Sequence, residues 1–192
     1  TGLDEVGRGC LAGPVCAGAV HLPADFLRAR PERRLPAVDD SKKLSPAARE
    51  ELATAVAALH RAGTLGCSLG WASSAEIDEH DITGATFLAM DRALATLGEL
   101  VRVDEPCLLD GRSSRRWQRA HEGIVGGDGR SLAIALASAV AKVARDAFMA
   151  GQHRAFPAYG WEANKGYATA RHRAALAAHG PTPLHRRSFL SP

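Results

Sequence analysis

The chain has 192 residues, a formal net charge of +3 and 46% hydrophobic residues, which fits one domain with a sizeable core. It contains no apolar run of about 18 residues, which argues against a membrane-spanning helix. The four cysteines lack the spacing of a disulfide or zinc framework. We therefore expect a single cytoplasmic domain over residues 1–192, with reduced cysteines. Because the chain starts at Thr1 on a predicted strand, we also expect that residues precede it in the full protein.

Strand-like and helix-like segments alternate along the chain. In chain order we predict strands at 1–3 and 15–22, a loop at 23–44, a helix at 46–60, a strand at 63–71, helices at 73–79 and 84–97, strands at 107–109 and 123–127, and helices at 131–150 and 167–180. Ser45-Pro46 is typical of a helix start, and Gly180-Pro181 of a helix end. The alternation favours an α/β domain with a layered or mixed sheet. We expect the part at about 150–192 to be helical, basic and peripheral.

Acidic residues stand at the ends of several predicted elements. Asp4 and Glu5 follow the first strand, Asp110 follows the strand at 107–109, and Asp128 lies in a glycine-rich turn before the longest helix. Strand ends of an open α/β sheet meet at one edge, and carboxylates suit Mg²⁺ or Mn²⁺. Singly, Asp110 and Asp128 also fit ordinary turns or a helix start. Together the acids predict a site for two ions that could activate water in phosphoryl transfer.

Asp4 and Glu5 raise a geometric question of their own. Adjacent residues on a regular strand point to opposite faces, so both can reach one site only if the strand ends there. Gly7 and Gly9 follow immediately and allow such an ending. We therefore expect the first strand to end at the two carboxylates.

Basic residues are unevenly distributed. Residues 151–192 carry Arg154, Lys165, Arg171, Arg173, Arg186 and Arg187 against Glu162 alone, a net +5, which leaves −2 for residues 1–150. Such a basic part favours a polyanionic partner, although a solvated helical surface explains the charge equally well. The only lysines are Lys42, Lys43, Lys142 and Lys165. Lys142 and Asp146 are four residues apart on the predicted long helix and could pair with each other.

Eight ordered segments of the chain resemble bacterial ribonuclease HII, a type 2 ribonuclease H. They are Gly2–Gly9, Leu11–Val15, Asp40–Ser45, Leu109–Gly111, Gly127-Asp128 with Ser131, Ala141–Asp146, Asn164–Tyr167 with Thr169, and Gly180-Pro181 with His185–Phe189. The resemblance covers almost the whole chain. It implies a ribonuclease H-like mixed sheet flanked by helices, with a helical C-terminal extension.

The resemblance also implies an activity and its residues. The activity is cleavage of RNA within RNA–DNA hybrids, and of single ribonucleotides embedded in duplex DNA, giving 3′-hydroxyl and 5′-phosphate ends. Asp4, Glu5, Asp110 and Asp128 match the catalytic carboxylates that hold two Mg²⁺ or Mn²⁺ ions. Gly7, Arg8 and Gly9 match the turn that recognises the 2′-hydroxyl, and Tyr167 matches the aromatic residue that packs on the next sugar.

These roles agree with the chemistry of the residues. A 2′-hydroxyl distinguishes RNA from DNA, and a tyrosine ring on a deoxyribose would crowd a ribose there. Lys42, Lys43, Lys165, Arg186 and Arg187 could contact backbone phosphates. For each of them a structural or solvent-exposed role stays open, as do phosphate binding alone for Arg8 and helix-start packing for Tyr167. One departure is Gly126, where the family often has lysine.

Two alternatives remain at this point. Ribonuclease HIII is a sibling enzyme with a different glycine turn, and a non-catalytic nucleic-acid-binding module would use only the basic part. Four intact acids argue against the module, because acids repel phosphate unless a metal ion lies between them. We expect RNA–DNA hybrids and ribonucleotide-containing duplex DNA as partners, no membrane contact, and a monomer. Contact with a replication clamp has no support in the sequence.

Overall fold

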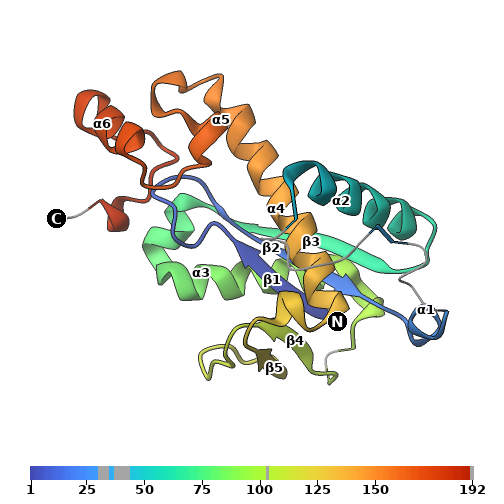
Figure 1. Ribbon diagram of the computed structural model, residues 1–192. Helices are drawn as coiled ribbons and strands as arrows, with labels where there is room; N and C mark the ends of the chain where they lie inside the picture. The colour runs from blue at the N-terminus through green and yellow to red at the C-terminus, as the bar shows by residue number, and fades with distance from the viewer. Residues whose placement is uncertain (30–34, 37–43, 103, 191–192) are drawn as a thin grey trace.

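The computed structural model describes residues 1–29, 35–36, 44–102 and 104–190. Within these ranges, five strands form one sheet in the order β3-β2-β1-β4-β5 (Figure 1). They are β1 (Gly2–Val6), β2 (Val15–His21), β3 (Gly66–Ala72), β4 (Cys107–Asp110) and β5 (His121–Ile124). β2 pairs antiparallel with both β1 and β3, whereas β4 pairs parallel with both β1 and β5. The expected mixed sheet is confirmed.

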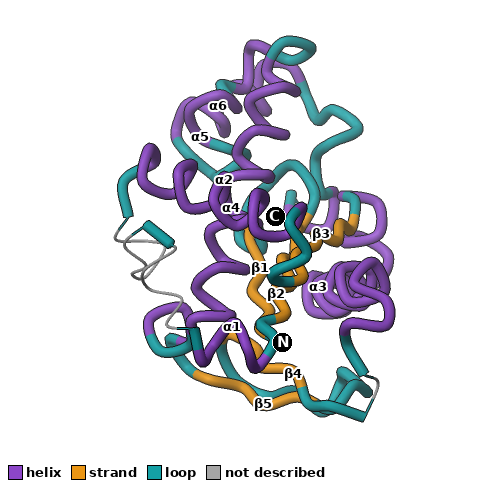
Figure 2. Tube along the Cα trace, turned by 90° about the vertical axis from the view of Figure 1, so that its right-hand side faces the viewer, coloured by secondary structure: helices purple, strands orange, loops and turns teal. Residues whose placement is uncertain are grey.

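Helices cover both faces of this sheet. Figure 2 shows α3 on one side of the strands and α2 with α4 on the other. The helices are α1 (Ala24–Arg28), α2 (Pro46–Arg61), α3 (Ser74–Leu97), α4 (Leu132–His153), α5 (Trp161–Asn164) and α6 (Ala170–His179). Short 3-10 turns lie at η2 (Gly98–Leu100), η3 (Gly127–Gly129), η4 (Pro157–Tyr159) and η5 (Arg187–Phe189). In the described ranges, none of the helices has the length and apolar character needed to cross a membrane.

The central strand β2 contributes to a core on each face of the sheet. Val15 and Ala17 pack in the cluster that contains Met90 of α3, whereas Val20 packs with Leu136 of α4. Successive side chains of a strand point to opposite faces, so β2 serves both cores and is almost wholly buried. The four cysteines are free thiols.

Helix α4 lies directly on the sheet because two strand positions beneath it are glycine. A Cβ atom at Gly2 would lie 2.5 Å from the backbone carbon of Ala133, and one at Gly18 would collide with the carbonyl oxygen of Ala137. Any larger residue would therefore push the helix away. This close packing brings the middle of α4 next to the end of β1.

Two of the three predicted helix starts with a Ser or Thr before them are confirmed, and the third is shifted. Ser45 Oγ accepts the amide of Ala48 at 3.2 Å, and α2 begins at the next residue, as the Ser-Pro pair predicts. Helix α4 begins directly after Ser131, as predicted. Helix α6 begins three residues later than predicted, because Thr169 Oγ1 caps it by accepting the amide of His172 at 3.3 Å.

Other predictions about elements need correction. β1 continues through the two carboxylates to Val6, and the short helix α1 lies within the expected loop at 23–44. β5 covers 121–124 and stops before Gly126, whose φ of 65° turns the chain. The two helices predicted at 73–79 and 84–97 are confirmed as the two segments of α3, which meet at Asp81, where the backbone leaves the helical conformation (φ 58°).

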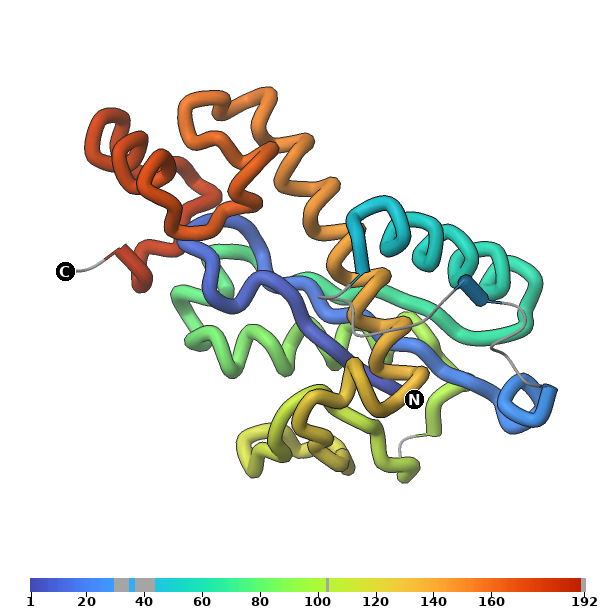
Figure 3. The backbone as a smooth tube through the Cα atoms, viewed as in Figure 1, coloured from blue at the N-terminus to red at the C-terminus, as the bar shows by residue number. Residues whose placement is uncertain are grey.

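The C-terminal part packs against the loop between β1 and β2. Figure 3 shows this loop, residues 7–14, beside the C-terminal segment in red. Ala12 forms an antiparallel bridge with His185, and the fully buried Trp161 belongs to the same small apolar cluster as Ala12. The helical character expected for 150–192 is confirmed, and these contacts tie this part to the body of the domain.

Candidate active site

Three of the predicted site carboxylates meet in one cavity. Asp4 and Glu5 lie on β1, and Asp110 is the last residue of β4, the parallel neighbour of β1. All three line a cavity of about 490 Å³. Because parallel strands bring their carboxyl ends to the same edge of a sheet, two distant segments of the chain deliver acids to one place.

The β1–β4 ladder stops at this cavity. The strands pair at Gly2 with Leu108 and at Leu3 with Leu109, so Asp4 and Asp110 occupy the next positions, where pairing has ended. The amide of Glu5 donates to Asp4 Oδ1 at 2.7 Å and draws that carboxylate toward Glu5. Both acids therefore line one cavity although the strand continues past them, which corrects the expectation that it must end there.

Asp128 stands beside this group and does not line the cavity. It is buried in η3, and the amide of the preceding residue, Gly127, donates to Asp110 Oδ1 at 2.7 Å. The turn that contains Asp128 thus orients the Asp110 carboxylate. The structure therefore places Asp128, the fourth predicted acid, at the edge of the site, directly after the residue whose amide contacts Asp110.

Burial, and to a smaller extent the charges of neighbouring acids, raises the pKa of two of these acids. Burial raises the pKa of Asp4 to about 8, and the neighbouring charges of Glu5 and Asp110 add to the effect. Hydrogen bonds from Ser138 and from the Glu5 amide act in the opposite direction. Burial also raises the pKa of Glu5, against the lowering effect of Arg8, whose Nη1 lies 3.3 Å from Glu5 Oε1.

The donor set of the cavity fits a hard divalent cation. It offers carboxylate oxygens, the ligands that Mg²⁺ and Mn²⁺ prefer. A bound cation would also offset the repulsion between the acids, which adds to the effect of burial on the pKa of Asp4. No three His, Cys, Asp or Glu side chains of the described residues are already grouped closely enough to hold an ion. Asp4, Glu5 and Asp110 are the residues that could hold one, with Asp128 next to them.

The predicted substrate-reading residues line the same cavity. Gly7, Arg8 and Gly9 follow β1 directly, and Tyr167 reaches the cavity from the C-terminal part. Tyr167 is 41% exposed, which leaves its ring free to pack on a ligand. Both backbone groups of Tyr167 are hydrogen-bonded. Its amide donates to the Asn164 carbonyl at 2.8 Å, and its carbonyl lies 2.9 Å from Nδ1 of His172 on α6.

Of the lysines and C-terminal arginines predicted to contact phosphates, those that the structure describes do not line this cavity. Lys42 and Lys43 lie outside the described residues. Lys165 Nζ donates to the Glu162 carbonyl at 2.6 Å and lines an adjoining cavity of about 530 Å³. Arg186 is fully buried and donates only to backbone carbonyls, so direct phosphate contact by this side chain is wrong for the conformation seen.

Besides the predicted site residues, the cavity is lined by Val6 of β1, Arg49 of α2, and Ser138 and Lys142 of α4. The last two are four residues apart within 132–144, a part of α4 that is otherwise apolar and rich in alanine, and this spacing places them on one face. That pattern was a usable signal. The pair predicted between Lys142 and Asp146 is confirmed at 2.9 Å. Arg49 offered no signal, because it lies among ordinary surface charges of α2.

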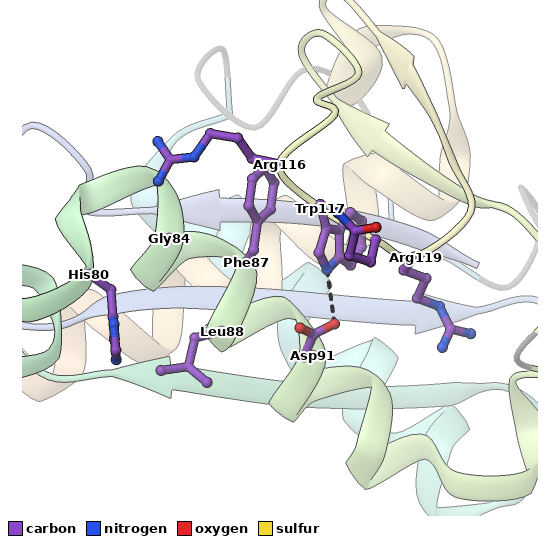
Figure 4. A pocket seen from close by; sticks show the side chains of 9 residues that line it. His80, Gly84, Phe87, Leu88, Asp91, Arg116, Trp117 and Arg119 are labelled. Atoms are coloured by element: carbon purple, nitrogen blue, oxygen red, sulfur yellow. Dashed lines mark hydrogen bonds between the residues drawn. The ribbon is translucent and has the colours of Figure 1, made fainter.

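A second cavity, of about 540 Å³, lies between α3 and the 112–122 loop (Figure 4). Its polar groups are already engaged in structure. Trp117 Nε1 donates to Asp91 at 2.9 Å, and Arg116 forms an ion pair with Asp81 at 2.7 Å, where α3 bends. None of the four predicted acids lines it. These contacts anchor the loop that follows Asp110 onto α3.

The sequence model of the family described as Ribonuclease HII matches residues 1–191. The chain belongs to the ribonuclease HII family. The chain is 52% identical to a ribonuclease HII of Paramagnetospirillum magneticum and 53% identical to one of Rhodospirillum rubrum. Both matches cover 98% of this chain, and they cover 88% and 82% of those proteins, respectively. As a member of the ribonuclease HII family, the chain is a hydrolase and a nuclease of the ribonuclease H type.

Solved structures agree on the fold. The ribonuclease HII in a PCNA complex from Archaeoglobus fulgidus superposes with a TM-score of 0.70 at 24% identity, covering 100% of this chain and 95% of that one. A ribonuclease HIII solved with Mn²⁺ gives 0.73 at 20% identity, covering 98% and 66%. The ribonuclease H-like fold is thus confirmed. The fold alone does not separate ribonuclease HII from HIII, and the sequence matches place this chain with ribonuclease HII.

Proposed function

We propose that this chain cleaves the RNA strand of RNA–DNA hybrids and the phosphodiester bond at single ribonucleotides in duplex DNA, leaving 3′-hydroxyl and 5′-phosphate ends. The observation that carries the proposal is the shared cavity. Carboxylates from β1 and β4 line it together with the Gly7–Gly9 turn and Tyr167. The residues that could bind a cation and those that could recognise a sugar would therefore contact the same nucleotide of a bound substrate.

We assign cation binding to Asp4, Glu5, Asp110 and Asp128. Bound Mg²⁺ or Mn²⁺ would supply an activated water and charge stabilisation at the scissile phosphate. The chain's own groups prepare the ligands: the Gly127 amide orients Asp110, Ser138 donates to Asp4, and Arg8 holds Glu5. Ionised carboxylates bind cations, so the raised pKa of Asp4 means that ion binding releases a proton from this site near neutral pH.

We assign substrate selection to the turn and the tyrosine. Glycines at 7 and 9 let backbone groups approach a ribose, whose 2′-hydroxyl is the feature that DNA lacks. The half-exposed ring of Tyr167 supports packing on the following deoxyribose, where a 2′-hydroxyl would collide with the ring. Together these contacts would place the cut at a step from RNA to DNA.

The test uses a DNA duplex with one ribonucleotide, an all-DNA duplex and a continuous RNA–DNA hybrid. We expect Mg²⁺- or Mn²⁺-dependent cutting of the first and third, none of the second, and no cutting in a chelator. Asp110→Asn should reduce kcat by more than about 100-fold, because it removes a cation ligand and not merely a supporting contact. It should keep the melting temperature and the affinity for the duplex.

Three results would contradict the proposal. Uncut single-ribonucleotide duplex with efficient hybrid cleavage would indicate a ribonuclease HIII-like specificity. Binding of all three duplexes without any cleavage would indicate a binding module. A normal kcat in Asp110→Asn would rule out the assigned cation site.

A further inference from the structure

Two arginines lie fully buried beneath the Gly7–Gly9 turn. Arg145 comes from α4 and Arg186 from the C-terminal segment, and both have 0% exposure. Neither forms an ion pair with a carboxylate of a described residue. Arg186 stays a cation near neutral pH, since burial lowers its pKa only to about 10. Burying a charge without a counter-charge lowers stability unless hydrogen bonds compensate it. The hydrogen-bond partners of these two side chains therefore indicate their structural role.

Among the described residues, both guanidinium groups donate hydrogen bonds only to backbone carbonyls, and Arg186 also lies over the ring of Phe189. Arg186 Nη1 donates to the Arg8 carbonyl at 2.8 Å, and Nη2 donates to the Gly7 carbonyl at 2.6 Å. Nε and Nη2 of Arg186 also donate to the Gly13 carbonyl, at 3.0 and 2.8 Å, respectively. Arg145 donates to Pro14, Lys165 and Ala12 at 2.9, 3.0 and 3.2 Å. The carbonyls of the turn are therefore drawn toward the interior by a planar, rigid donor fork.

This arrangement fixes the direction of two amides. In a planar trans peptide the C=O and the following N–H point in opposite directions. The inward carbonyls of Gly7 and Arg8 therefore direct the N–H groups of Arg8 and Gly9 outward, where both residues are exposed and line the acid cavity. No backbone hydrogen bond among the described residues uses either amide as a donor. Two adjacent amides without a backbone acceptor, above two buried guanidinium groups, form a site for an oxygen acceptor.

The glycine of the turn is matched to the arginine below it. Gly7 has a φ of 93°, and a Cβ atom there would collide with Nε of Arg145. The turn and the two buried arginines therefore fit each other as one unit. Arg186 also stands next to His185, which forms the bridge to Ala12, so the C-terminal segment holds the guanidinium in place.

We propose that Arg186 is a positioning residue, which holds the Gly7 and Arg8 carbonyls inward so that the Arg8 and Gly9 amides face the cavity as a donor pair for a substrate oxygen. The inference rests on the proposed function. It replaces the phosphate contact expected for Arg186 with an indirect role. The acceptor is an oxygen of the nucleotide at the turn, either the 2′-hydroxyl or a phosphate oxygen.

The test is Arg186→Lys in the full chain, with Arg61→Lys as control. Lysine keeps the charge but loses the fork, so the turn carbonyls lose their fixed direction. Arg61 is an exposed arginine at the far end of α2. The readouts are kcat/KM for the single-ribonucleotide duplex and the inhibition constant of the all-DNA duplex as competitor, after thermal melting shows that each variant is folded.

We expect Arg186→Lys to lower kcat/KM by roughly 10- to 100-fold, the usual effect of a misplaced binding group. If the acceptor is the 2′-hydroxyl, the inhibition constant of all-DNA duplex stays within about twofold of wild type. If the acceptor is a phosphate oxygen, inhibition weakens as well, and it weakens for wild-type protein too when a neutral methylphosphonate replaces the phosphate at the turn. Arg61→Lys should match wild type in all respects.

Unchanged kcat/KM in folded Arg186→Lys would overturn the proposal. If the variant does not fold, hydrogen exchange of the wild-type protein decides the question. The Arg8 and Gly9 amides should exchange fast in the free protein and slowly with saturating duplex, and fast exchange in both states would overturn it. Loss of the proposed function is a separate result, because wild-type protein would then leave the single-ribonucleotide duplex uncut.

Discussion

Asp4 shows how one residue can be unfavourable for folding and useful for cation binding. It is buried beside two other acids, and its pKa is raised from 3.8 to about 8. Between these two pH values the folded chain holds a proton that the unfolded chain has lost. The free energy of unfolding contributed by Asp4 therefore falls as the pH rises from about 4 to about 8.

Asp4→Asn removes this pH-dependent loss. Without divalent metal, we expect the variant to melt above the wild type at pH 8, with a difference that shrinks steadily toward pH 4. Thermal melting in a chelator across this range measures the effect, and Asp25→Asn, at an exposed carboxylate, serves as control. A difference of the same size at pH 4 and pH 8 would contradict the assigned protonation of Asp4.

At the scale of elements, the β1–β2 loop combines two different uses of glycine. Gly7 adopts a left-handed backbone conformation over a buried arginine, whereas a Cβ atom at Gly9 would meet no atom within 4 Å. Gly7 is thus required by the fold, and Gly9 borders open space in the cavity. The repeated glycines of the Gly-Arg-Gly sequence look equivalent in the chain and differ only in the folded structure.

Alanine substitutions separate the two uses. Gly7→Ala should lower the free energy of unfolding by about 1–3 kcal/mol or more, because of backbone strain and the collision with Arg145. Gly9→Ala should change it by no more than about 0.5 kcal/mol, as for other unstrained surface positions. Its methyl group would still enter the space that a nucleotide needs, so kcat/KM should fall. Denaturant unfolding and cleavage assays test both, and a fully active Gly9→Ala would remove this glycine from the substrate site.

At the scale of the whole molecule, the C-terminal part completes the site from outside the sheet. It supplies Tyr167 to the cavity, Arg186 to the turn, and the His185 bridge to Ala12. The basic charge of this part first suggested a nucleic-acid surface. The structure shows that one of its arginines, Arg186, is buried and hydrogen-bonded to backbone carbonyls. A count of charges cannot distinguish such a residue from an exposed one.

A chain that ends at Gly180 tests this dependence. It lacks Arg186 and the bridge, so the turn loses its carbonyl partners and buried apolar surface becomes exposed. We expect a lower melting temperature and a loss of cleavage of the single-ribonucleotide duplex, measured against the chain of 192 residues. A truncated chain with unchanged melting and activity would show that this part is peripheral after all.

The sequence by itself was enough for the fold class and most elements, and three of the four acids that it singled out line one cavity. Local signals such as the Ser45 cap and the strand alternation act within a few residues, and the family motifs extend over almost the whole chain. Predictions were weakest where elements end, because strand pairing and turns such as Gly126 set those limits.

Only the tertiary structure decided how the acids meet and which groups Arg186 contacts. The convergence of Asp4, Glu5 and Asp110 depends on parallel pairing between strands about a hundred residues apart, and on the point where that ladder stops. The role of Arg186 depends on burial, which determines whether a guanidinium meets phosphate or carbonyl oxygen. The sequence determines the chemistry of each side chain, whereas packing determines which groups that side chain contacts.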